Sequence, residues 1–311
     1  MKRRTFLRIN TLVATGMVLH PVRGLGQIRP AGKIRMGGPV FGKYPDPDEW
    51  AGAVRKAGYT AAYCPLKPDA GDDLVNLYRK SALQNGIIIS EVGAWSNPLS
   101  PDAPMAAAAI QKCIGSLELA DRIGASCCVN ISGSRNEKHW AGPHPANLTT
   151  DTFDQVVETV RKIIDAVKPE RTFYTLEAMP WTYPDSADSY LRLIKAIDRK
   201  QFAVHLDPVN LVVSPQVLYS NGEMIRDAFR RLGRWIKSCH AKDVTIRQDT
   251  YLPQLDEVRP GLGLLDYRTF LRELSALDNV PLMLEHLKTA EEYDLAASHI
   301  KQVAAELNLS T

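Results

Sequence analysis

The segment from residue 173 to residue 207 shows the pattern that decides the fold. It opens with the apolar run Phe173–Leu176 (FYTL), which ends at Glu177, and a proline-containing loop then leads into a helical stretch. A second apolar run, Ala203–Leu206 (AVHL), ends at Asp207. Strand, helix and strand in this order are typical of parallel strands, which are apolar on both faces because helices cover them.

The same alternation repeats along the chain from residue 33. Eight strands are expected, at Ile34–Gly38, Ala61–Pro65, Ile87–Val92, Ser126–Ile131, Phe173–Ala178, Ala203–Asp207, Ile236–Ala241 and Pro281–His286. The expected helices are Pro47–Lys56, Asp72–Asn85, Ala103–Ile123, Asp151–Val167, Asp185–Asp198, Glu223–Leu232, Tyr267–Leu277 and Ala290–Leu307. Eight such units with no second composition zone predict an α/β protein, a single (β/α)8 TIM barrel over residues 27–311. An open doubly wound sheet is the alternative, but Pro39 removes an N–H from the segment that would have to bind phosphate.

The first 26 residues predict a twin-arginine signal peptide rather than part of the fold. Lys2, Arg3, Arg4 and Arg8 precede the mildly apolar Ile9–Leu19, which predicts export to the periplasm. The whole chain has a formal net charge of +3, and residues 1–26 contribute five positive charges and no negative one, which leaves −2 for residues 27–311. We therefore expect no nucleic-acid partner, and no apolar run is long enough to predict a stable membrane anchor.

The chain contains five cysteines, an odd number, without the spacing of a zinc site. They are Cys64, Cys113, Cys127, Cys128 and Cys239. We interpret them as buried free thiols, because a protein that folds in the cytoplasm before export does not need disulfides.

Four consecutive predicted strands end in a potential metal ligand. These residues are Glu177, Asp207, His240 and Glu285. Barrel enzymes carry their sites at the carboxyl ends of the strands, so the four side chains are expected to converge. Three carboxylates would repel one another there unless a cation neutralised them, and carboxylate with imidazole suits one divalent metal such as Mn, Mg or Co. Pairing of each acid with a nearby Lys or Arg is the alternative.

Several short motifs resemble the xylose-isomerase-like TIM-barrel superfamily, the sugar phosphate isomerases and epimerases, over roughly residues 33–308. They are Leu176-Glu177, His205-Leu206-Asp207-Pro208, His240-Ala241-Lys242-Asp243, Pro260-Gly261-Leu262-Gly263 with Asp266-Tyr267, and Leu284-Glu285. The resemblance implies that Glu177, Asp207, His240 and Glu285 bind one metal and that Glu177 and Glu285 form the acid/base pair. The ketose 3-epimerases of this superfamily usually have a histidine three residues after the strand-six aspartate, where this chain has Asn210.

The resemblance implies a metal-dependent isomerase or epimerase that acts on a keto-sugar through an enediolate. Asn210 keeps a second interpretation open, a lyase that eliminates the C1 substituent of a 3-keto-glycoside, because asparagine is a poor acid or base. A non-catalytic sugar-binding protein is a third. Each interpretation implies a small-molecule carbohydrate partner, and each is compatible with a homo-oligomer.

Other polar and aromatic residues at predicted strand ends and loops are candidate substrate contacts. They are Lys242, Asn210, Trp181, Trp95, Glu91, Arg259 and His139, with Trp140 in the long loop Gly133–Leu148. Tryptophan faces stack on sugar rings, and a loop of this length is typical of a segment that covers a substrate. His205 is expected to pack behind the ligands rather than to bind metal.

Overall fold

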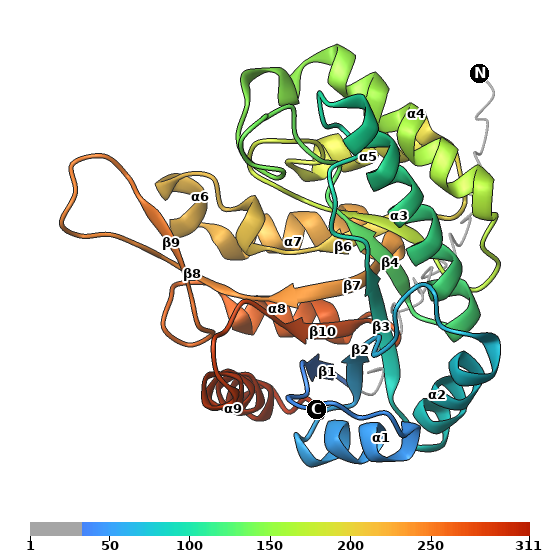
Figure 1. Ribbon diagram of the computed structural model, residues 1–311. Coiled ribbons are helices and arrows are strands. Elements are labelled where there is room, and N and C mark those ends of the chain that lie inside the picture. Colours follow the sequence, from blue (N-terminus) through green and yellow to red (C-terminus); the bar gives the residue numbers. More distant parts are fainter. Residues whose placement is uncertain (1–32) are drawn as a thin grey trace, which may run out of the picture. The chain divides into compact units, whose positions relative to one another are not determined.

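The computed structural model describes residues 33–311, which form a closed barrel of eight parallel strands surrounded by helices (Figure 1). Neighbouring strands follow the order β1-β10-β7-β6-β5-β4-β3-β2, and β1 pairs with both β10 and β2. The barrel strands are β1 (Arg35–Gly38), β2 (Ala61–Tyr63), β3 (Ile88–Gly93), β4 (Cys127–Asn130), β5 (Tyr174–Glu177), β6 (Phe202–Leu206), β7 (Ile236–Ala241) and β10 (Pro281–Leu284). The predicted single (β/α)8 barrel is confirmed. The predicted signal at residues 1–26 lies outside the described residues.

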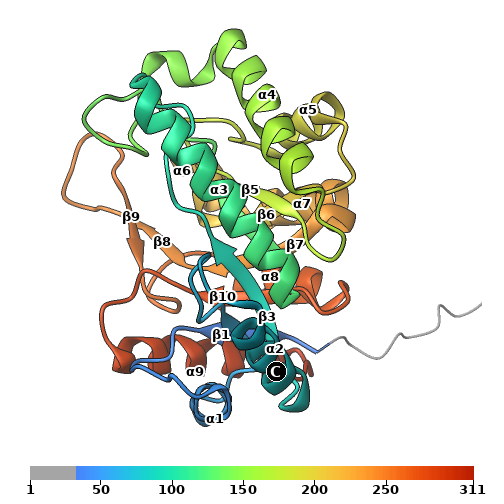
Figure 2. The ribbon, with the colours of Figure 1, turned by 45° about the vertical axis from the view of Figure 1, so that its right-hand side comes forward.

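Nine α-helices and three short 3-10 helices are found in this part of the chain (Figure 2). The α-helices are α1 (Pro47–Lys56), α2 (Asp72–Gln84), α3 (Ala103–Ile123), α4 (Thr150–Val167), α5 (Ala187–Ile197), α6 (Pro215–Tyr219), α7 (Asn221–Leu232), α8 (Tyr267–Ser275) and α9 (Ala290–Glu306). The 3-10 helices are η1 (Pro145–Leu148), η2 (Val209–Leu211) and η3 (Gly233–Trp235). Within the described residues, no helix is long and apolar enough to cross a membrane.

Local sequence signals fix where the helices begin and end. The Asp46 side chain accepts hydrogen bonds from two N–H groups in the first turn of α1, and Asp102 and Thr149 cap α3 and α4 in the same way. Ser186 is the N-cap of α5, and its side chain accepts from the N–H of Ser189. Gly124 ends α3 with a φ of 74°, a left-handed conformation that favours glycine.

The core lies between the barrel and its ring of helices. The strands contribute side chains that are almost fully buried, such as Leu176, Leu206 and Leu282. Cys113, Cys127, Cys128 and Cys239 are buried, Cys64 is partly buried, and all five are free thiols, as expected. Burial raises the pKa of the Cys64 thiol to about 11, so it remains protonated at neutral pH.

An antiparallel hairpin that was not expected from the sequence interrupts the barrel pattern after β7. It consists of β8 (Asp243–Ile246) and β9 (Leu255–Val258), paired from Asp243 opposite Val258 to Ile246 opposite Leu255. Both views show its loop projecting away from the barrel (Figures 1 and 2). Because the hairpin begins two residues after β7 ends, it lies beside the carboxyl ends of the strands, where the candidate site is.

Candidate metal centre

The structure brings the four predicted metal ligands together. Each of Glu177, Asp207, His240 and Glu285 offers one ligand atom, and these atoms all lie within 4.8 Å of one another. Nδ1 of His240 lies 3.1 Å from Oε1 of Glu177, 2.8 Å from Oε1 of Glu285 and 4.0 Å from Oδ2 of Asp207. One nitrogen with three carboxylate oxygens around a common centre is a donor set that divalent cations use.

The cluster is buried and attracts positive charge. Asp207 and His240 are fully buried, and Oδ2 of Asp207 and Oε1 of Glu285 receive no hydrogen bond from the described residues. The ammonium of Lys242, itself 4% exposed, faces these two oxygens at 2.9 Å and 2.7 Å. One ammonium does not neutralise the three carboxylates of Glu177, Asp207 and Glu285, and this excess of buried negative charge fits a divalent metal.

The pKa values of the cluster reflect two opposing effects, burial and the charges of neighbouring groups. Burial raises the pKa of Asp207 to about 6 despite the nearby Lys242 ammonium, with further increases from Glu177 and Glu285. Burial would also raise the pKa of Glu177 and Glu285, but His240 and Lys242 outweigh it and hold both pKa values below the usual range. The two glutamates are therefore ionised at neutral pH, as a base or a metal ligand must be.

A second buried group lies behind His240 and holds its ring. Nε2 of His240 lies 3.3 Å from Oε1 of Glu91, and Oε2 of Glu91 lies 2.9 Å from Nε2 of His205. Ser238 donates to Oε2 of Glu91 at 3.0 Å. A metal-binding histidine commonly donates its other N–H to a carboxylate, which leaves the first nitrogen free for the metal. Glu91 thus points Nδ1 of His240 at the other three ligands, and His205 packs behind them as expected.

Asn210 contacts one of the four predicted metal ligands directly. It belongs to η2, which follows Asp207, and its Nδ2 donates to Oε1 of Glu177 at 2.9 Å. The N–H of Val209 donates to Oδ1 of Asp207 at 2.9 Å, which leaves Oδ2 facing the cluster. The residue that departs from the 3-epimerase pattern is therefore placed to orient the carboxylate of Glu177.

A cavity of about 580 Å³ opens above the cluster. The predicted contacts that line it are Glu91, Trp95, Trp181, Asn210 and Lys242, together with Trp140, Glu177 and Glu285. Trp181 donates from Nε1 to the carbonyl of Ala141 at 2.7 Å, which fixes its ring against the long loop. Three tryptophans above a polar floor can take up the apolar face of a sugar while its hydroxyls point to the floor.

Two predicted substrate contacts lie outside the lining of this cavity. His139 is exposed, and its Nδ1 accepts from the N–H of Ala141 at 3.3 Å, which shapes the long loop. Arg259 donates to the carbonyl of Pro260 at 3.2 Å. Glu91 lines the cavity, but both of its oxygens are engaged by protein groups, so the structure gives it a positioning role towards His240.

Two further residues of the site were missed in the sequence. Glu257, on β9, lies with Oε2 3.7 Å from the ammonium of Lys242 and Oε1 3.0 Å from Nδ1 of His286. His286 has a φ of 59°, and a non-glycine residue in the left-handed region is uncommon and often found at functional sites. Both residues line the cavity. The alternating Val244 and Ile246 were the signal for the hairpin that carries Glu257.

The Asp243 carboxylate links the motif His240-Ala241-Lys242-Asp243 to the motif Pro260-Gly261-Leu262-Gly263. It accepts from the N–H groups of Gly261 and Gly263 at 3.0 Å each, and from that of Leu265 at 2.9 Å. A Cβ at position 263 would lie 2.3 Å from Oδ1 of Asp243, so only glycine fits there. One side chain next to Lys242 thus holds the loop that follows β9.

Comparison with known proteins agrees with this geometry. Residues 51–303 match the family described as xylose isomerase-like TIM barrel. The chain belongs to that family. A search of curated proteins finds no match to the sequence.

Solved structures with this xylose isomerase-like fold have varied activities. Endonuclease IV from Thermus thermophilus has a TM-score of 0.66 at 14% identity over 87% of this chain and 98% of its own. The 3-keto-D-glucoside 4-epimerase from E. coli has a TM-score of 0.61 at 11% identity, over 87% and 100%. D-psicose 3-epimerase from Clostridium cellulolyticum, solved with D-tagatose, has a TM-score of 0.59 at 16% identity, over 88% and 96%. At these identities the likeness shows the fold, and the activity must be argued from the site.

Proposed function

We propose that the protein is a divalent-metal-dependent isomerase or epimerase of a keto-sugar. The observation that carries this proposal is the placement of two ionised glutamates, Glu177 and Glu285, in one buried ligand cluster that also lines the cavity. Two carboxylates around one reacting carbon can remove a proton and return one, which is what an epimerase requires. Two of the structural neighbours are named as sugar epimerases.

Each residue of the cluster has a role in this chemistry. A bound divalent cation would polarise the ketone and its neighbouring hydroxyl and so acidify the adjacent C–H. Glu177, held by Asn210 at 2.9 Å, is the better oriented of the two bases, and Glu285 is the second. Lys242 places an ammonium beside the cluster and can stabilise the oxyanion of an enediolate. The metal would be Mn, Mg or Co, because three carboxylates and one imidazole form its donor set.

The cavity favours an uncharged sugar over a sugar phosphate. Lys242 and His286 are its cationic lining residues, and both already face carboxylates, at Glu285 and Glu257. The tryptophans supply stacking surface instead.

A lyase is the second candidate, favoured by Asn210. A glutamate would take the C2 proton of a 3-keto-glycoside, and the C2–H electron pair would form a C1–C2 double bond. The C1–O bond would break, and its electron pair would leave on the departing oxygen. Asn210 can orient Glu177 for the first proton transfer but cannot itself return a proton to the carbon. Because asparagine replaces a histidine that could donate a proton, the site favours elimination over return of a proton to the substrate carbon.

The test is exchange of substrate hydrogen with solvent. Purified protein loaded with Mn, Mg or Co is incubated in deuterated water with a panel of keto-sugars and 3-keto-glycosides, and deuterium at the carbon beside the ketone is measured by NMR. We expect exchange with at least one substrate, lost in Glu177→Gln and Glu285→Gln and retained in Glu170→Gln, an exposed control. An epimer as product supports the first candidate and a released aglycone the second. No exchange with any substrate, together with sugar binding that Glu177→Gln leaves intact, would indicate a non-catalytic sugar-binding protein.

We also propose that residues 1–26 direct export to the periplasm through the twin-arginine pathway. The paired Arg3 and Arg4 before an apolar stretch support this proposal. Replacing both by lysine in the full chain should retain the protein in the cytoplasm of a bacterial host. Unchanged periplasmic recovery would contradict the proposal.

A further inference from the structure

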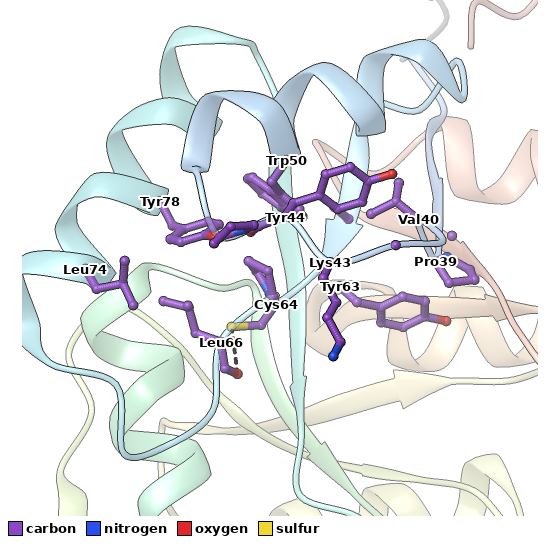
Figure 3. Close-up of a pocket in the computed structure, with 15 residues that line it drawn as sticks. Pro39, Val40, Lys43, Tyr44, Trp50, Tyr63, Cys64, Leu66, Leu74 and Tyr78 are labelled. Atoms are coloured by element: carbon purple, nitrogen blue, oxygen red, sulfur yellow. Dashed lines mark hydrogen bonds between the residues drawn. The ribbon is translucent and has the colours of Figure 1, made fainter.

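A second cavity has a volume of about 670 Å³. Figure 3 shows the side chains that line it. It is formed by the loops that follow β1 and β2 together with side chains of α1 and α2. Its lining residues are Gly38, Pro39, Val40, Gly42, Lys43, Tyr44, Pro45, Trp50, Ala62, Tyr63, Cys64, Pro65, Leu66, Leu74 and Tyr78. A volume in this range suits a small-molecule group rather than a protein segment.

The two cavities adjoin. Pro39 and Tyr63 line both of them. The Tyr63 hydroxyl donates to the carbonyl of Leu284 at 3.0 Å, one residue before the metal ligand Glu285, so its ring is held at the boundary. A substrate whose sugar ring lies above the metal cluster could therefore extend a substituent past Tyr63 into the second cavity.

The lining favours an aromatic group over a second sugar ring. Val40, Leu66 and Leu74 are aliphatic, and the cavity also contains the edge-packed rings of Trp50 and Tyr78. The hydroxyl of Tyr44 already donates to the carbonyl of Phe41 at 2.8 Å, and that of Tyr78 donates to the carbonyl of Tyr44.

A sugar in this cavity would place hydroxyl groups against apolar side chains, which offer them no hydrogen bond. An aryl group would instead pack against the aliphatic and aromatic walls. Among residues 33–311, Lys43 is the one charged residue that lines the cavity, and its exposed ammonium suits a phenolic oxygen or an aromatic face at the rim.

We propose that this second cavity binds the aromatic C1 substituent of a keto-glycoside whose sugar ring lies at the metal centre. The inference rests on the proposed function for the place of the sugar ring. It adds the class of substrate: an aryl glycoside rather than a free monosaccharide.

The test measures binding without turnover. The metal-loaded protein is titrated by calorimetry with 4-nitrophenyl β-D-glucoside and with methyl β-D-glucoside, neither of which carries the ketone that the proposed reaction needs. We expect the aryl glucoside to bind at least about tenfold more tightly, because burying an aromatic ring contributes more than that factor. Equal affinities, or no measurable binding of the aryl glucoside, would overturn the proposal.

Two variants on α2 locate the effect. Leu74 lines the cavity, whereas Leu77, on the same helix and 53% exposed, does not. Leu74→Arg should abolish the preference for the aryl glucoside, and Leu77→Arg should retain it, with the melting temperature as a check on folding. A preference that survives Leu74→Arg would overturn the proposal. If the preference behaves as expected but no keto-sugar exchanges its hydrogen, the proposed function fails and the aryl site stands.

Discussion

Replacing Lys242 by methionine should destabilise the protein, and a divalent metal should reverse most of that loss. The ammonium is 4% exposed and lies 2.9 Å from Oδ2 of Asp207 and 2.7 Å from Oε1 of Glu285. Methionine keeps most of the side-chain volume and removes the charge, so the carboxylates retain only His240 as a buried cationic partner. Breaking a buried ion pair by removing one partner costs about 3–5 kcal/mol of the free energy of unfolding.

That loss corresponds to a measurable change in melting temperature. With an unfolding entropy of about 2.1 cal/mol/K per residue, a barrel of this size has about 0.6 kcal/mol/K in total, so we expect Lys242→Met to lower the melting temperature by about 5–8 °C in the presence of chelator. Saturating Mn²⁺ should stabilise the variant more than the wild type, because the cation supplies the missing charge to the same oxygens.

The assay is calorimetric melting with chelator and with Mn²⁺. Arg247→Met is the control, because its ion pair with Asp256 on the hairpin is 51% and 37% exposed and should contribute no more than about 1 kcal/mol. Equal melting temperatures for Lys242→Met and the wild type in chelator, or equal stabilisation of both by Mn²⁺, would refute the reasoning.

Three further outcomes follow from the site. Asp207 has a pKa of about 6, and although burial would lower the pKa of His240, the surrounding carboxylates raise it well above its usual value. A metal must displace both protons, so titrations at pH 5, 6 and 7 should show metal affinity falling as the pH falls, by at least about tenfold per pH unit below pH 6. Constant affinity would contradict the ligand roles of both residues. Glu91→Gln should weaken metal binding by about 10–100-fold, because the substitution disturbs the carboxylate that faces Nε2 of His240. Unchanged affinity in the same titration would show that Glu91 does not position the imidazole ring. Asn210→Ala should slow deuterium exchange by about 10–100-fold, because a hydrogen bond to the ionised Glu177 is lost, with little change in melting temperature. An exchange rate equal to that of the wild type would exclude this orienting role.

The barrel and the convergence of Glu177, Asp207, His240 and Glu285 could be predicted from the sequence because both follow local rules. Each barrel strand is a short buried run before a helix, so Glu177 and Asp207 could be placed at strand ends without knowing the packing. Parallel strands in a closed barrel then bring those ends together. The helices α1 and α3 were bounded correctly because a capping aspartate precedes each one and a proline lies in its first turn.

The remaining features depend on contacts between residues distant in sequence. Glu91 was expected near the site, and it lines the cavity. Its contacts with His205 on β6 and His240 on β7 cross the barrel interior, because neither strand neighbours β3 in the sheet, and no local sequence pattern predicts such contacts. The hairpin β8–β9 was missed because β9 (LDEV) is half acidic and only partly buried, so it lacks the apolar run that marks the barrel strands. Glu257 was missed for the same reason.

The most direct test of the metal centre is the number of divalent ions bound per chain. Isothermal titration of chelator-treated protein with Mn²⁺, checked by elemental analysis, should give one ion per chain. His240→Ala and Asp207→Asn should each reduce the affinity strongly, with the fold checked by circular dichroism. Absence of a stoichiometric ion in the wild type, or undiminished binding in both variants, would contradict the account that Glu177, Asp207, His240 and Glu285 form the metal centre.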